Sequence, residues 1–145
     1  SLLPKKYKIQ FRAALERFAQ AKSSQDGQKM ALDLGISLEM LLTYSENKKE
    51  FPDHLSLAFR IRGAWLAGKN LGDRKHIFKT LNTIYSHRSQ VAHKGEIDYG
   101  GLNPTQIKEM QNTHLEVAER IFQSLIVVGE VPIWNEIILG GPLPE

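Results

Sequence analysis

The chain has 145 residues, the length of one ordinary domain, and its 19 basic and 16 acidic residues give a formal net charge of +3. This mildly basic charge permits contact with nucleic acid without arguing for it, and the absence of cysteine excludes disulfide bonds and thiolate metal sites. No apolar stretch reaches the roughly 20 residues of a membrane span, and the start of the chain lacks both a signal-peptide core and an initiator Met. We therefore expect one cytoplasmic domain over residues 1–145, with no membrane contact, taken from a longer protein.

Apolar residues recur at three- and four-residue spacing along most of the chain, which predicts helices. No segment alternates at two-residue spacing between Gly or Pro turns, so no sheet is expected. The predicted helices span residues 4–22, 26–44, 53–68 and 73–94, followed by a helix of about two dozen residues that begins at 103 and is broken by Pro132, and by a short terminal helix over 133–139. The predicted fold class is all-α, an antiparallel bundle of about five helices plus a short C-terminal helix.

Local signals mark several helix boundaries. Asp53 and Asp73 are predicted to cap the third and fourth helices at their N-terminal ends, and Gly95 to end the fourth. Gly35 and Ile36 lower the helix propensity in the middle of the second helix, where a kink or split can occur.

The fourth predicted helix carries an arginine where its apolar face calls for leucine. Its inward stripe consists of Ile77, Leu81, Ile84, Arg88 and Val91. A guanidinium is costly to bury unless it is paired, so the arginine needs an acidic partner or an anionic ligand. Glu39 is the candidate structural counter-ion, for either Arg88 or Arg62.

A small group of chemically capable side chains surrounds this arginine. Ser89 and His93 are four residues apart and share a face of the helix, and Tyr85 lies one turn earlier. A fixed cation beside a histidine suits a phosphodiester, because arginine grips the phosphate oxygens and histidine moves a proton. The 2′-hydroxyl of RNA can act as the nucleophile, so no metal and no cofactor are required. In the alternative reading, Arg88 is a structural arginine and His93 merely sits where the helix dipole favours a cation.

Residues 81–95, LNTIYSHRSQVAHKG, resemble the signature of HEPN domains, which reads Tyr, two residues, Arg-Ser, three residues, His-Gly. The closest branch is the Apea-like one, and residues 37–42, 59–66 and 131–139 are loosely similar to three of its other segments. The chain departs from the pattern where Lys94 stands between the histidine and the glycine. Ser89 also replaces the Asn, Asp or His that often follows the arginine in active toxins.

The resemblance implies a helical bundle that forms a homodimer and acts as a metal-independent endoribonuclease on RNA. Arg88 would bind the scissile phosphate and His93 would act as general base or acid, with Ser89, Tyr85, Lys94 and Arg62 contacting the substrate. It also implies the C-terminal part of a bacterial protein with a role in antiviral defence or a toxin system. Two alternatives remain: a non-catalytic module that dimerises or binds RNA or nucleotide for a partner domain, and a plain helical scaffold.

Overall fold

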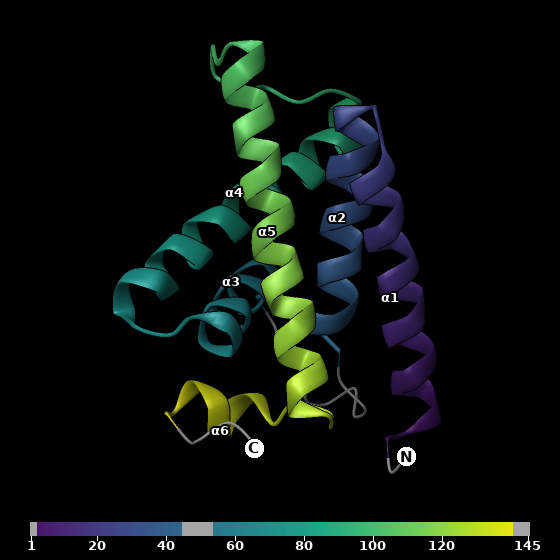
Figure 1. Cartoon of the computed structure of the whole chain (residues 1–145), viewed down its shortest axis with the longest axis vertical. Helices are drawn as coiled ribbons and strands as arrows, with labels where there is room; N and C mark the ends of the chain where they lie inside the picture. Colours follow the sequence, from purple (N-terminus) through teal and green to yellow (C-terminus); the bar gives the residue numbers. More distant parts are fainter. Residues whose placement is uncertain (1–2, 45–53, 141–145) are drawn as a thin grey trace.

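Six α-helices and no strand make up the part of the chain that the computed structural model describes, residues 3–44 and 54–140. They are α1 (Lys5–Ser23), α2 (Gly27–Leu42), α3 (Leu55–Ala67), α4 (Leu71–Lys94), α5 (Pro104–Val128) and α6 (Trp134–Ile138) (Figure 1). The all-α helical bundle predicted from the periodicity is confirmed. Within the described ranges no helix has the length and apolar character needed to cross a membrane.

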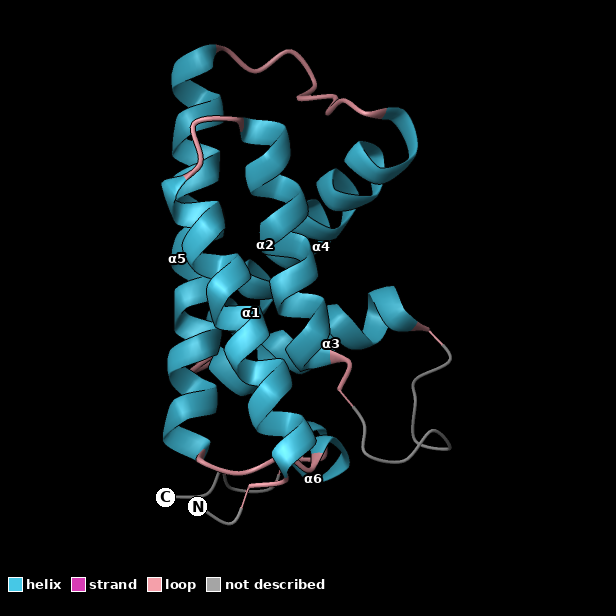
Figure 2. Ribbon diagram, turned by 90° about the vertical axis from the view of Figure 1, so that its right-hand side faces the viewer, coloured by secondary structure: helices cyan, strands magenta, loops and turns pink. Residues whose placement is uncertain are grey.

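The long helices α1, α2 and α5 run side by side, and α4 crosses the bundle obliquely (Figure 1). The closest helix pairs are α1 with α2, and α4 with both α2 and α3. The loop after α4 passes over one end of the bundle to the start of α5 (Figure 2). The start of α1 and the short α6 lie at the opposite end (Figures 1 and 2). Helix α4, which carries Arg88 and His93, therefore packs against α2 and against α3.

The helices meet in one apolar core, to which the middle helices contribute most. Its most deeply buried large side chains include Leu34, Leu38, Leu41, Leu42, Phe59, Ile77, Leu81, Ile84, Val117 and Ile121. The predicted inward stripe of α4 agrees with this core as far as Ile84, beyond which Arg88 and Val91 are only half-buried. The C-terminal part of α4 thus leaves the core and approaches the surface.

Side chains and glycines close the helix ends as local rules require. The Asp26 carboxylate accepts hydrogen bonds from the first turn of α2, and Asn103 forms a reciprocal capping box at the start of α5. Gly95 ends α4 with a φ of 73°, the left-handed conformation that glycine adopts most easily, as predicted. Asp53 lies outside the described residues, and α3 begins at Leu55.

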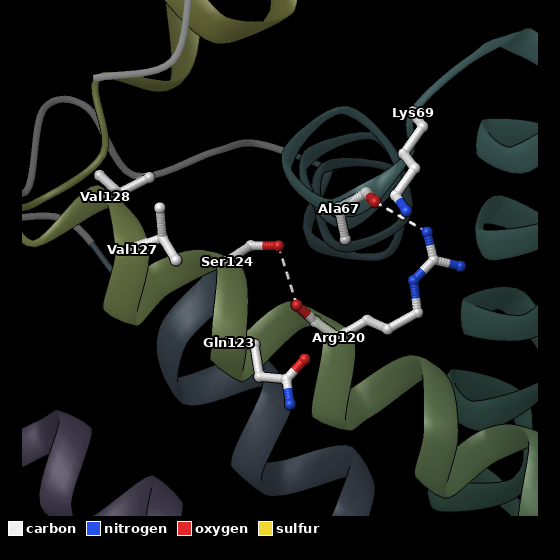
Figure 3. A pocket seen from close by; sticks show the side chains of 7 residues that line it. All are labelled: Ala67, Lys69, Arg120, Gln123, Ser124, Val127 and Val128. Atoms are coloured by element: carbon white, nitrogen blue, oxygen red, sulfur yellow. Dashed lines mark hydrogen bonds between the residues drawn. The ribbon is translucent and has the colours of Figure 1, made fainter. Parts of the chain in front are cut away.

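The predicted N-cap of α4 is wrong. Asn70 caps the helix through a 2.9 Å hydrogen bond from the Asp73 backbone N–H, because it precedes Asp73 by the three residues that a cap requires. The Asp73 carboxylate instead accepts from Lys69 N at 2.9 Å and from two guanidinium nitrogens of Arg120 at 2.9 and 2.5 Å. Arg120 also donates to Ala67 O at 2.9 Å, which ties α5 to the end of α3 (Figure 3).

Candidate functional site

The C-terminal half of α4 carries most of the candidate residues. Tyr85, Ser89 and His93 follow one another at four-residue spacing and share a face. Arg88 and His93 are five residues apart, which is about 140° around an ideal helix. In a single chain the guanidinium and the imidazole therefore start from different sides of α4.

Arg88 lies against a glycine of α2. A Cβ built on Gly35 would fall 2.5 Å from the Cβ of Arg88 and 2.6 Å from its Cγ. Helix α2 is continuous through this glycine, so the possible kink is absent. The missing side chain lets α4 approach α2 closely enough for the stem of Arg88 to pack on the α2 backbone.

One turn further along α2, Glu39 forms an ion pair with Arg88. Their Nε and Oε2 atoms are 3.0 Å apart, and both are sealed from solvent. The N–H is not directed at the oxygen, so the contact is an attraction between charges without a hydrogen bond. Of the two arginines proposed from the sequence as partners of Glu39, the structure pairs it with Arg88.

The rest of the Arg88 guanidinium is free to bind an anion. The side chain is 28% exposed, and its two Nη nitrogens make no hydrogen bond with any described residue. These nitrogens are also not sealed from solvent, unlike Nε. A guanidinium that is oriented by a carboxylate on one edge and open on another is suited to grip a phosphate oxygen.

His93 and Lys94 are exposed in the last turn of α4. Within residues 3–44 and 54–140, neither side chain is in a salt bridge. The negative end of the helix dipole favours a cation at this position. Both side chains are therefore accessible to a ligand from solvent.

Tyr85 and Ser89 are half-buried on α4. The ring of Tyr85 lies 5.6 Å from that of Phe59, tilted by 60°. It also borders a hollow of about 560 Å³ that His54 and Arg60 of the α3 side help to line. Tyr85 is therefore placed where a group bound near Arg88 can extend toward α3.

Arg62 is held elsewhere. Its Nη1 donates to Leu42 O at 2.8 Å, and its guanidinium lies 5.2 Å from the Trp134 ring centroid. Burial lowers its pKa. These contacts join α3 to the end of α2 and to α6, and they give Arg62 a packing role apart from Arg88.

Gln90 was not singled out from the sequence, although its side chain makes two hydrogen bonds near the end of α4. Its Oε1 accepts a 2.7 Å hydrogen bond from Asp98 N, and its Nε2 donates to Ser86 Oγ at 3.1 Å. This side chain fastens the loop after α4 back onto the helix, next to His93. In the sequence, the only sign of this role is that a glutamine stands near the end of a predicted helix and a glycine-rich loop follows.

Two buried histidines, His87 on α4 and His114 on α5, lie close to each other. The rings of His87 and His114 are 5.8 Å apart, and Tyr99 contacts His87 edge-on at 5.6 Å. Burial lowers the pKa of both histidines, to about 4 for His114, whose pKa the neighbouring His87 also lowers. They are neutral packing groups between α4, α5 and the loop, and the described residues contain no cluster of side chains that could hold a metal ion.

A second hollow, of about 430 Å³, lies beside Arg120 and the exposed Val127 (Figure 3). Asp73 and the Ala67 carbonyl already engage the Arg120 guanidinium, which leaves the exposed Lys69 as the other cation of this hollow. The residues around Arg88 remain the best candidate for anion chemistry. Comparisons of the chain with protein-family models, with curated proteins and with solved structures found no match.

Proposed function

We propose that this protein is a HEPN-like domain that binds RNA and cleaves it without a metal ion. Arg88 holds the scissile phosphate, and His93 transfers a proton. The 2′-oxygen bonds to phosphorus as the bond from phosphorus to the 5′-oxygen breaks, which leaves a 2′,3′-cyclic phosphate and a 5′-hydroxyl. One proton leaves the 2′-hydroxyl and one reaches the departing oxygen, so His93 serves as base or as acid in this step.

The observation that carries the proposal is the ion pair between Arg88 and Glu39. It fixes the guanidinium through a sealed Nε while the Nη nitrogens remain open, one and a half turns from an exposed His93. Preorganised donors of this kind stabilise charge that develops on a phosphate. Lys94 adds a second positive charge at the same helix end.

Because Arg88 and His93 lie about 140° apart around α4, their side chains start from different sides of the helix within one chain. The proposal includes a homodimer in which the α4 helices of two protomers face each other, so that one phosphate meets both residue types. The resemblance of residues 81–95 to the HEPN signature supports this arrangement, as it does the cytoplasmic, defence or toxin setting.

The test is an RNA cleavage assay in EDTA with end-labelled single-stranded RNA. The wild-type protein should produce cyclic-phosphate ends, and Arg88→Ala and His93→Ala should each lose the activity. His76→Ala is the matched control, because His76 is also exposed on α4 but lies more than four turns from His93. Cleavage that survives His93→Ala, or wild-type protein that cleaves no RNA, would refute the enzymatic proposal.

A non-catalytic RNA-binding module is the second candidate, and the separation of Arg88 and His93 around α4 favours it. A module of this kind would retard RNA in a gel without cutting it, and salt would weaken the binding. Arg88→Ala would then abolish the shift, while His93→Ala would reduce it only slightly.

A further inference from the structure

A groove runs between α3 and the first half of α4, on the other side of Arg60 from the hollow that Tyr85 borders. We call it the α3–α4 groove, and its volume is about 310 Å³. Its lining consists of Ile61, Ala64, Trp65, Leu71, Arg74, Lys75 and Phe78. The two helices that form it lie at one side of the bundle (Figure 1).

Two apolar side chains of α4 border the groove, and one of them, Phe78, also packs against the bundle core. Leu71 and Phe78 are seven residues apart and share the groove side of the helix, whereas Ile77 and Leu81 face the core. Leu71 is 66% exposed. A concave site with apolar walls and a polar rim is typical of an interaction surface.

Two guanidiniums lie over aromatic rings of this region. The guanidinium carbon of Arg74 is 4.0 Å from the Trp65 ring centroid, and that of Arg60 is 5.0 Å from the Phe78 ring centroid. The stem of Arg74 also packs tightly against Gly68, where a Cβ would collide with its Cγ. Arg74 is thus held in place by packing.

These cations have no acidic partner in the described residues. No carboxylate there forms a salt bridge with Arg60, Arg74 or Lys75. Asp73, which precedes Arg74 in the chain, is engaged by Arg120 and by the Lys69 backbone. The buried Nε of Arg74 also lacks a hydrogen-bond partner. The groove therefore joins an apolar floor to uncompensated positive charge.

This combination fits an acidic peptide better than a nucleic acid. A nucleobase binds by stacking on an open aromatic face, but guanidiniums already cover faces of Trp65 and Phe78. A stacked guanidinium still presents its N–H edge, which matches a carboxylate. The apolar walls accept a side chain, and aromatic residues and arginine are the types enriched at the energetic centres of protein interfaces.

We propose that the α3–α4 groove docks an acidic segment of another protein. One large apolar side chain of that segment sits between Leu71 and Phe78, and flanking carboxylates pair with Arg74 and Lys75. This inference does not depend on RNA cleavage, because it concerns a different surface and a different partner.

The test starts with selection from a displayed library of random 12-residue peptides on the full chain. The enriched peptides should carry Asp or Glu around a large apolar residue. In fluorescence anisotropy, Leu71→Ser and Lys75→Glu should each weaken the selected peptide by about tenfold or more. Both substitutions are at exposed positions, and Lys108→Glu on α5 is the matched control that should bind as the wild type does. Replacing the peptide's acids with amides should weaken it similarly.

Three results would overturn the proposal. One is selection that enriches no acidic peptides, and another is peptide binding that Leu71→Ser leaves unchanged although the variant keeps the wild-type circular dichroism. The third is displacement of the peptide by a 12-nucleotide oligouridylate, which would assign the groove to RNA.

Discussion

Gly35 and Arg88 occupy the same small space between α2 and α4, since a Cβ on the glycine would lie 2.5 Å from the Cβ of the arginine. The glycine is therefore a packing requirement of the site and not a weak point of the helix. It lets the carboxylate of Glu39, one turn later, reach the Nε of Arg88.

Gly35→Ala should destabilise the protein by about 1–3 kcal/mol, because the added methyl forces the two helices apart. Chemical denaturation measures the loss. Gly72→Ala is the control, because a Cβ there meets only Asn70 Oδ1 at 3.4 Å, so its stability should be unchanged or slightly higher. Equal effects of the two substitutions would argue against a close approach at Gly35.

Glu39→Ala should lower the free energy of unfolding by about 1–3 kcal/mol, because it leaves the sealed Nε of Arg88 without its opposite charge. The double variant Glu39→Leu with Arg88→Met should recover most of that stability, since two apolar side chains can replace a buried ion pair. If the pair positions Arg88 for phosphate, the stable double variant will still fail to bind RNA. Wild-type RNA binding by that variant would leave the pair with a purely structural role.

His93→Ala should leave the free energy of unfolding within about 0.5 kcal/mol of the wild-type value, because the side chain is exposed and outside the core. Thermal denaturation and RNA cleavage on the same preparation separate stability from chemistry. A large loss of stability would show that His93 makes contacts on which the fold depends.

Stability should fall as the pH is lowered from about 6.5 toward 4. The folded protein keeps His114 neutral, with a pKa of about 4 against 6.5 for an unperturbed histidine, so the unfolded chain binds more protons in this window. Burial lowers the pKa of His87 as well, which adds to the same trend. Urea denaturation at several pH values measures the slope, and His114→Gln should flatten it. An unchanged slope in that variant would assign the acid sensitivity to other groups.

The helices were predicted well from the sequence because the spacing of their apolar residues reflects which side of each helix packs in the core. Leu81 and Ile84 were placed correctly on α4 for this reason. The N-cap of α4 was misassigned because Asn70 and Asp73 are both good capping residues, and the sequence alone does not say which lies three residues before a free N–H. The partner of Asp73 lies on α5, beyond the reach of local rules.

The candidate site could be predicted only in part, because its contacts also join residues that are far apart in the sequence. Glu39 was identified as a counter-ion, but the choice between Arg88 and Arg62 depended on how α2, α3 and α4 meet in space. The α3–α4 groove was not predicted from the sequence, because Phe78 falls within the same run of apolar residues on α4 as the core residues. Only the structure separates Phe78 from its neighbour Ile77.

Consecutive residues of α4 contact different neighbours, with His87 against α5 and the following loop and Arg88 against α2. Helix α4 therefore cannot turn about its own axis without breaking both sets of contacts at once. The orientation of α4 is therefore fixed before a ligand binds at Arg88. Little of the ligand's binding free energy is then spent on aligning the guanidinium. Substitutions at His87 should accordingly weaken anion binding at Arg88 without touching the ligand.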